Sequence, residues 1–424
     1  MSAATESGVI ASEELLRSTV RRAVADTPVL DVHTHIYSAD FGDLLLWGVD
    51  ELLTYHYLIA EVSRNDPRTT PEQFYAMSPQ ERANHIWRRL YLEGSPISEA
   101  QRGPLTTLQA LGIDVSQRDL APAREYFRDV TVHEHIDTVF RLANVSAAVM
   151  TNDPFDEGER ATWEGEGNTD PRFLSALRID GLLVFWRDNV GRMQGWGYEV
   201  SATPDARTCV EVRRFLADWI ERMKPVYMAV SLPDTFRFPD DRPRSRLITE
   251  AVLPVCEERG IPFAMMIGVK RAMNPALQLA GDGVGKFDIT VLERMCVENP
   301  GVRFLVTLLS RENQHELAVA ARKFPNLMPF GCWWFLNNPS IIEEITRMRL
   351  ELLGLSFIPQ HSDARILDQL IYKWKHFREI FTGILADKYA DLMRTGWRLT
   401  PAHVERDVKR LFSGNFEEFA HLSR

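Results

Sequence analysis

Two histidines separated by one residue are the first candidates for chemistry in this chain. His33 and His35 lie in the run Val29-Leu30-Asp31-Val32-His33-Thr34-His35-Ile36, whose apolar and β-branched residues predict a short strand. Side chains alternate along a strand, so both imidazoles project to the same face. Such a pair at a strand end can bind one metal ion and predicts half of a metal site. Taken alone, it is also compatible with two polar residues that leave a strand.

The composition is that of a soluble globular protein. The chain has 424 residues, of which 45% are hydrophobic and 25% are charged. This length accommodates one large α/β barrel with insertions, or two domains. The formal net charge of −10 argues against nucleic acid and membrane surfaces as partners, because both require clustered positive charge. An anionic substrate would need local arginines.

Cysteine usage and hydropathy indicate the compartment. The four cysteines are widely spaced without a paired motif, so we interpret them as reduced and structural. No run of about 18 apolar residues occurs, so we expect no transmembrane helix. Glu6, Glu13 and Glu14 arrive early, and no basic segment followed by an apolar run precedes them, which argues against a secretory signal. We therefore expect a cytoplasmic protein, and a homo-oligomer.

Helical segments surround the histidine pair in the sequence. Residues 11–26 predict a helix that leads directly into the first strand, with Ser12 as a plausible N-cap. Residues 37–143 are helical in texture and are broken by several prolines. They contain the cluster Tyr55-His56-Tyr57, for which the simpler interpretation is the polar rim of an amphipathic helix. Long excursions after one strand usually carry function, so we assign 37–143 as a large helical insertion after strand 1.

Strand-like and helix-like segments alternate through the remainder of the chain. The apolar runs after the first strand are Asn144–Asp153, Phe173–Asp180, Pro225–Leu232, Ile261–Gly268, Arg303–Leu309, Leu327–Phe335 and Leu355–Asp363. The helical segments between them include Thr208–Met223, Ser245–Arg259, Ile289–Glu298, Gln314–Lys323 and Ile341–Leu353. Buried strands that alternate with helices indicate a parallel sheet. Eight such units favour an α/β fold of the closed (β/α)₈ TIM-like barrel type, with residues 1–424 as one domain and a helical tail after 364.

In such barrels the reactive side chains lie where strands end at the carboxyl face. His33 and His35 end strand 1, and Asp363 ends strand 8, so we predict that they converge on one divalent metal ion. Zinc accepts nitrogen and carboxylate ligands and keeps a position open for catalysis, which makes it the expected ion. His133-Glu134-His135 repeats the spacing, but it precedes the helical run 136–142, and we expect it at the surface.

Three arginines follow other strand ends. Arg178, Arg311 and Arg365 suit a carboxylate-bearing substrate, because each guanidinium can donate two parallel hydrogen bonds. For any one of them, a structural salt bridge is the alternative. Trp333 and Trp334 follow strand 7, where indole rings fill space or form a wall for a sugar ring.

Together these motifs resemble the amidohydrolase superfamily and, within it, the uronate isomerase (glucuronate isomerase) family. The matching pieces are Asp31-Val32-His33-Thr34-His35, Tyr55-His56-Tyr57, Thr151-Asn152-Asp153-Pro154, Leu177-Arg178-Ile179-Asp180, Ser310-Arg311-Glu312-Asn313, Trp333-Trp334-Phe335 and Ser362-Asp363-Ala364-Arg365. Each piece is weak by itself, but their order makes the match specific. One departure is the end of strand 5, where Met266-Ile267-Gly268 stand in place of the superfamily's usual histidine. With no lysine ending strand 4, a binuclear centre is not expected.

The resemblance implies interconversion of D-glucuronate with D-fructuronate, and of D-galacturonate with D-tagaturonate. It assigns Asp363 as the catalytic base and Tyr57 as a proton relay at the sugar oxygens. His56 would orient a hydroxyl, Arg178 would anchor the substrate carboxylate, and Arg311 and Arg365 would assist. The hydrogen moves as a proton, so no nicotinamide is needed, and no dinucleotide fingerprint is present.

Other functions fit the same motifs. A metal-dependent hydrolase or lactonase would use the ion to activate water, with Asp363 as proton acceptor. A decarboxylase on the same scaffold would release carbon dioxide. A sugar-acid binding protein without catalysis would need the arginines and tryptophans, but no base.

Overall fold

Seven parallel strands lie side by side at the centre of the chain, in a computed structural model that describes residues 8–422. They are β1 (Val29–Thr34), β2 (Val145–Asn152), β3 (Phe173–Arg178), β4 (Met228–Pro233), β5 (Phe263–Lys270), β7 (Phe304–Leu308) and β8 (Leu327–Pro329). Each overlaps a predicted run, and β4 and β5 extend one and two residues beyond theirs. Neighbours in sequence are neighbours in the sheet, apart from the short β6 (Gly283–Val284), which pairs antiparallel with β5. This order is that of a barrel, and it confirms the predicted α/β TIM-like fold.

Residues 355–363, a segment without regular strand structure, lie between β8 and β1 and close the sheet. Near its start, Ile358 donates through its N–H to the carbonyl of Pro329 (3.1 Å) and accepts from the N–H of Gly331 (2.9 Å). Near its end, the N–H of Asp363 donates to the carbonyl of His33 (3.1 Å). Backbone hydrogen bonds therefore run on both sides of the segment, which takes the place of the eighth strand.

The last two predicted strands are shorter than the sequence indicates. Of the run Leu327–Phe335 only three residues form β8, and of the run Leu355–Asp363 only Ile358 makes a bridge. Both runs contain left-handed backbone, which interrupts a regular strand: Gly331 (φ 66°) lies two residues after the end of β8, and Trp334 (φ 48°) and Asp363 (φ 50°) follow near the ends of the two runs. These breaks turn the chain over the carboxyl end of the barrel.

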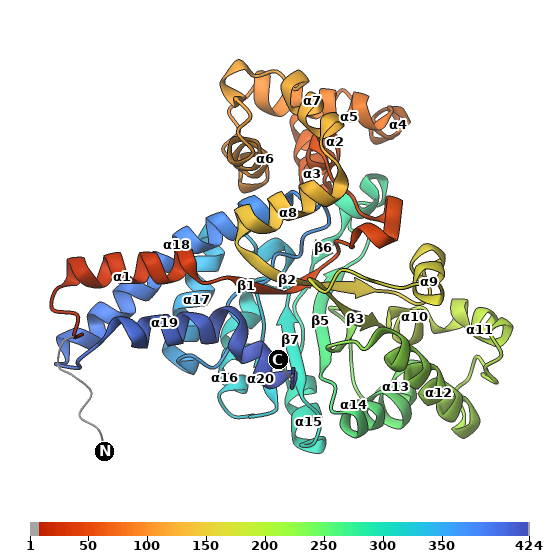
Figure 1. The fold of residues 1–424 in the computed structure, drawn as a ribbon. Helices are drawn as coiled ribbons and strands as arrows, with labels where there is room; N and C mark the ends of the chain where they lie inside the picture. The colour runs from red at the N-terminus through yellow and green to blue at the C-terminus, as the bar shows by residue number, and fades with distance from the viewer. Residues whose placement is uncertain (1–7, 423–424) are drawn as a thin grey trace.

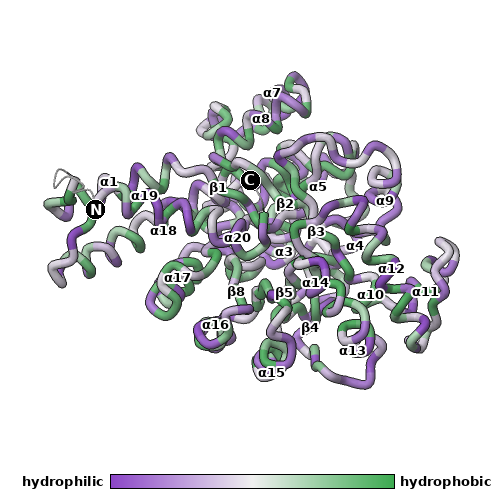
Figure 2. Tube along the Cα trace, turned by 60° about the horizontal axis from the view of Figure 1, so that its bottom comes forward, coloured by the Kyte–Doolittle hydropathy of each residue, from purple (hydrophilic) through white to green (hydrophobic). Residues whose placement is uncertain are grey.

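Helices surround the strands. They are α1 (Glu13–Asp26), α8 (Val132–Ala143), α9 (Glu157–Glu164), α10 (Asp180–Leu183), α11 (Trp186–Gly195), α12 (Ala206–Met223), α13 (Pro243–Leu247), α14 (Leu253–Arg259), α15 (Thr290–Glu298), α16 (Gln314–Ala321) and α17 (Pro339–Leu353). The predicted Ser12 cap of α1 is present, because its hydroxyl accepts from the N–H of Leu15. Figure 2 looks more nearly along the strands and shows α17, α16, α15 and α13 following one another around the outside.

The segment after β1 is helical and stands above the strands (Figure 1). Its helices are α2 (Val49–Leu53), α3 (His56–Asn65), α4 (Pro71–Ala76), α5 (Pro79–Ile86), α6 (Glu99–Ala110) and α7 (Ala121–Asp129). They share a small apolar core of their own, which includes Leu58, Phe74, Trp87 and Leu90. The helical texture is as predicted, while the assignment of 37–143 as one insertion within one domain stays a prediction.

The tail forms α18 (Gln369–Arg394), α19 (Pro401–Lys409) and α20 (Asn415–Phe419). Helix α18 runs beside α1, α6, α8 and α17, and so connects the barrel with the upper helices (Figure 1). One contact there corrects the prediction for His135: it is fully buried within α8, and its Nε2 lies 2.8 Å from Asp368. Its partner is remote in sequence, so the local pattern gave no sign of burial. His133 is exposed.

Two predictions from composition concern the whole chain. The four cysteines are free and buried, as expected. Among residues 8–422 no helix is both long enough and apolar enough to span a membrane. Glu6, on which the prediction about a secretory signal partly depends, lies outside the described residues.

Candidate active site

Two histidines and an aspartate meet at the carboxyl end of the barrel. The Nε2 atoms of His33 and His35 lie 3.6 Å and 3.4 Å from Oδ1 of Asp363. The potential ligand atoms of all three residues lie within 4.8 Å of one another. His33 and Asp363 are buried, and His35 is partly exposed. The predicted convergence across β1 and the closing segment is therefore confirmed.

Two hydroxyl groups determine which nitrogen of neutral His33 carries the proton. The hydroxyls of Thr151 and Tyr227 each lie 3.2 Å from Nδ1 of His33. Both have already donated their hydrogens to backbone carbonyls, of Thr34 (2.9 Å) and Val32 (2.8 Å). Each hydroxyl can therefore only accept from His33, which places the proton on Nδ1. Nε2 then presents its lone pair to Asp363, and it has no hydrogen-bond partner.

The charge states of the cluster suit a cation. Burial, helped by the charge of Arg365, lowers the pKa of His35 to about 3, so its imidazole is neutral at working pH. Two imidazole nitrogens and one carboxylate oxygen therefore face a common point, which is a donor set that zinc accepts. Among the described residues the group has three members, so further coordination positions are open to water or substrate.

A second group of polar atoms without partners lies beside this cluster. His56 begins α3, and its ring centroid lies 5.5 Å from that of Trp334. Nε2 of His56, Oη of Tyr57 and Nε1 of Trp334 are buried and have no hydrogen-bond partner among residues 8–422. Burial raises the pKa of Tyr57 well above its usual value, and the charge of Asp363 adds to that shift. Buried donors without partners are costly, so their gathering here points to a ligand that would pair with them.

The predicted arginines divide into two sets. Arg178 at the end of β3 donates to Asp180 (2.6 Å), and its Nε has no partner. Burial and, after it, the charge of Arg365 lower the pKa values of His35 and His56, so this guanidinium acts electrostatically on both groups. Arg311 differs: its side chain is 55% exposed and pairs with Glu344 (2.9 Å).

The two tryptophans also differ in what they contact. Trp333 is 3% exposed and packs in the apolar interior of the barrel, as the space-filling interpretation predicted. Trp334 stacks on Phe335, with a centroid distance of 5.0 Å, and faces His56. Trp334 is therefore the one whose indole N–H is positioned toward the group of unpaired donors.

One buried carboxylate near the site, that of Glu159, gives no signal in the sequence. Glu159 lies behind Arg178, where its carboxylate accepts from Tyr37 (2.8 Å), from Asn152 (3.0 Å) and from the backbone of Asp153 (2.9 Å). Burial raises the pKa of Glu159 to about 7 and that of Asp153 to about 6. Glu159 lies on a helix among other acidic residues, so only its contacts distinguish it.

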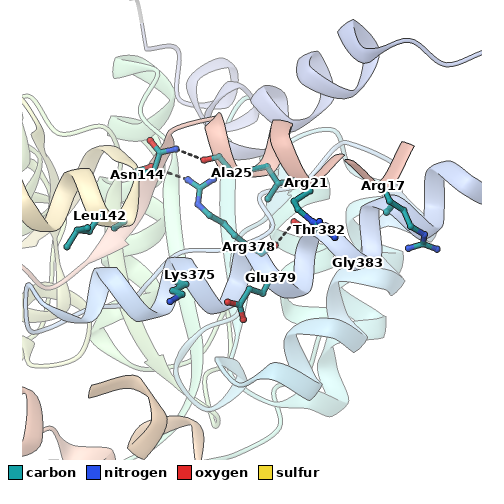
Figure 3. A pocket seen from close by; sticks show the side chains of 13 residues that line it. Arg17, Arg21, Ala25, Leu142, Asn144, Lys375, Arg378, Glu379, Thr382 and Gly383 are labelled. Carbon is teal, nitrogen blue, oxygen red and sulfur yellow. Dashed lines mark hydrogen bonds between the residues drawn. The ribbon is translucent and has the colours of Figure 1, made fainter. Parts of the chain in front are cut away.

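One sizeable cavity lies away from these residues. It has a volume of about 550 Å³ and lies between α1 and α18 (Figure 3). Two of its arginines serve the packing of the helices: Arg17 pairs with Asp387 (3.2 Å), and Arg378 donates to the carbonyls of Thr27 (3.0 Å) and Asn144 (3.1 Å). None of the predicted site residues lines it. The chemistry is therefore assigned to the barrel mouth.

A parallel barrel with two imidazoles from strand 1 and a carboxylate from the eighth unit is the arrangement that the resemblance to the amidohydrolase superfamily implies. The comparison with solved structures is more specific. The chain is 55% identical to a uronate isomerase from Bacillus halodurans over 98% of both chains, with a TM-score of 0.96. The chain belongs to the uronate isomerase family.

Two more distant structures share the fold. A uronate isomerase from Thermotoga maritima is 16% identical over 97% of this chain and 99% of its own, with a TM-score of 0.77. A glucuronate isomerase from Caulobacter crescentus is 15% identical over 97% and 95% of the two chains, with a TM-score of 0.75. Comparisons with family models and with curated proteins give no match.

Proposed function

We propose that the chain interconverts D-glucuronate with D-fructuronate, and D-galacturonate with D-tagaturonate. The observation that carries the proposal is the position of Asp363, which faces both imidazoles of the first strand at distances of 3.6 Å and 3.4 Å. The site thus combines a carboxylate base with buried, unpaired donors for sugar oxygens. Family membership supports the same substrate class.

The proton transfers of an aldose–ketose isomerisation can be assigned to two side chains. Asp363 takes the proton from C2 of the open-chain sugar, while the Tyr57 hydroxyl donates to the aldehyde oxygen as that oxygen gains charge. The resulting enediol gives its O2 proton back to Tyr57 and receives at C1 the proton held by Asp363. No proton is gained or lost overall. The raised pKa of Tyr57 keeps it protonated at neutral pH, as a donor must be.

The sugar carboxylate requires a positive anchor in a chain of net charge −10. We assign Arg178 and Arg365 to this role, because Arg178 has an unpaired Nε and the charge of Arg365 acts on His35 and His56. A guanidinium can bind a carboxylate through two parallel hydrogen bonds. Arg311, which pairs with Glu344 at the surface, is left out of the proposed anchor. His56 and Trp334 would bind hydroxyl groups between anchor and base, with Trp333 behind them as support.

His33, His35 and Asp363 would hold one divalent ion, which we take to be zinc. When bound, such an ion polarises a carbonyl or hydroxyl oxygen of the substrate. The protein's own contribution is the orientation of the ligands: Thr151 and Tyr227 set the tautomer of His33. We further expect the working form to be a cytoplasmic homo-oligomer.

A panel of uronic acids tests this function against the hydrolase alternative. Purified protein should convert D-glucuronate or D-galacturonate to the corresponding ketose, observable by NMR. Hydrolysis of sugar-acid lactones with no ketose formed would instead support the hydrolase. Release of carbon dioxide would support a decarboxylase.

A further inference from the structure

The backbone at Asp363 is unusual for a residue with a side chain. Its φ of 50° lies in the left-handed region, which residues other than glycine seldom adopt. The same residue supplies the carboxylate that faces His33 and His35. Neighbouring contacts must therefore hold this conformation, because it determines where the carboxylate points.

Those contacts converge on the preceding residue, Ser362. Its N–H donates to the buried carboxylate of Asp31 (3.0 Å), and its carbonyl accepts from Nζ of Lys373 (2.5 Å) and from the amide of Asn337 (3.3 Å). Its hydroxyl accepts from the N–H of Ala364 (3.1 Å). The N–H, the carbonyl and the hydroxyl of Ser362 therefore all have hydrogen-bond partners. Apart from Ala364, these partners lie on β1, on α18 and in the loop after β8.

Lys373 is the least expected of these partners. It lies in α18 and is 5% exposed, and within residues 8–422 it forms no ion pair. Its Nζ lies 6.0 Å from the centre of the Tyr55 ring. Burial lowers the pKa of Lys373 to about 8, opposed by the charges of Asp363 and Asp31, so the amine remains a cation at neutral pH. A buried cation without an ion-pair partner is costly, so the hydrogen bond to the Ser362 carbonyl offsets part of that cost.

Trp374, the next residue of α18, contacts Asp31, the same carboxylate that binds Ser362. The indole N–H of Trp374 donates to Oδ2 of Asp31 (2.8 Å), while Oδ1 of Asp31 accepts from Ser362. Two consecutive residues of α18 therefore bind both the strand that carries His33 and the residue before Asp363. The helix thereby couples the two halves of the metal site.

We propose that Lys373 is a positioning residue of the active site, which acts through the Ser362 carbonyl to hold the Asp363 carboxylate toward His33 and His35. It touches neither substrate nor ion in this role. The inference rests on the proposed function for its effect on turnover, but its effect on zinc affinity depends only on the ligand geometry.

The test replaces Lys373 by methionine, which keeps the length and removes the donor. Lys375→Met is the matched control, because Lys375 lies two residues later on the same helix and is exposed. Zinc affinity is measured by competition with a chromogenic chelator, kcat and KM are measured separately with D-glucuronate, and thermal unfolding is followed on metal-free protein. We expect K373M to bind zinc at least tenfold more weakly than the wild type. Its kcat should fall at least tenfold, while its KM stays within threefold. K375M should match the wild type in all of these measurements. Lys373→Gln, which can still donate to the Ser362 carbonyl, should restore part of both losses.

A folded K373M that keeps zinc affinity and kcat within threefold of the wild type would overturn the proposal. If K373M does not fold, K373Q decides: zinc affinity and kcat that are reduced by less than tenfold support the donor role, whereas values unchanged from the wild type, or losses of tenfold or more, contradict it. A wild type that turns over no uronate, together with zinc affinity lost in K373M, would refute the proposed function and leave the positioning role standing.

Discussion

Oδ1 of Asp363 lies 3.4 Å from Nε2 of His35, although one residue follows the first strand and the other ends the segment that closes the barrel. A carboxylate in this position can be both a ligand and a base.

Asp363→Asn should abolish turnover, because an amide cannot accept the C2 proton. We expect kcat to fall by about 10²–10⁴-fold. Uronate affinity should stay within about tenfold, or about 1.4 kcal/mol, because the arginine anchor is intact. Steady-state kinetics and equilibrium binding measure the two effects, with the exposed Asp391→Asn as control. Undiminished activity in D363N would rule out Asp363 as the base.

Tyr57→Phe should lower kcat more than it raises KM, because its hydroxyl acts on an oxygen whose charge develops during the reaction. A loss of about 10²-fold in kcat is expected. Tyr55→Phe, at the neighbouring ring 4.8 Å away, is the comparison that separates the role of Tyr57 from a general effect of burial. Equal losses in both variants would argue against a specific role for Tyr57.

Arg178→Met should weaken uronate binding by about 2–4 kcal/mol, as expected for the loss of a charged partner. The variant also leaves Asp180 buried without its arginine, so Arg178→Met combined with Asp180→Asn separates lost stability from lost affinity. Isothermal titration with D-glucuronate gives the affinities. Arg311→Met should bind uronate as the wild type does, and a comparable loss there would restore the anchor role that the sequence predicts for Arg311.

Removal of metal should destabilise the protein. At free zinc of about 100 times Kd, binding to the folded state adds about 2.7 kcal/mol to the free energy of unfolding, so chelator should lower Tm and added zinc should restore it. The response should vanish in His33→Ala and in His35→Ala. It should persist in His133→Ala, because His133 is exposed on α8. A Tm that does not respond to chelator or to zinc would argue against the site.

Glu159 should make stability fall as pH rises. Its carboxyl ionises near pH 4.3 in the unfolded chain, but its pKa is about 7 in the folded protein. Between these values the folded state binds more protons, so the free energy of unfolding decreases from about pH 4.5 to pH 7 and then levels off. The two pKa values correspond to a loss of about 4 kcal/mol. Asp153, whose pKa is raised to about 6, acts in the same direction.

Urea unfolding at pH 5 to 8 tests this dependence. Glu159→Gln removes the titrating group, so its stability relative to the wild type should rise by up to about 3 kcal/mol between pH 5 and pH 8. The comparison across pH separates this effect from any constant cost of the altered hydrogen bonds to Tyr37 and Asn152. A difference that does not change with pH would show that Glu159 does not titrate in this range.

Much of the fold is readable from local patterns. Strand and helix periodicity predict the parallel barrel units, because burial on both faces of a strand or on one face of a helix leaves a direct trace in the sequence. The two exceptions are the last two predicted strands, whose runs contain left-handed backbone at Gly331, Trp334 and Asp363. Such conformations are set by contacts with remote residues, so the hydrophobic pattern carries no sign of them.

The sequence by itself determined the His33 and His35 pair, because alternation along one strand places both imidazoles on one face whatever the rest of the chain does. Only the tertiary structure decided which remote groups complete the site. It placed Asp363 against both histidines, paired Arg311 with a surface glutamate, and buried Lys373 against the residue that precedes Asp363. The reason is physical: the direction of a single strand follows from its own geometry, whereas the surroundings of a charge depend on every element that packs against it.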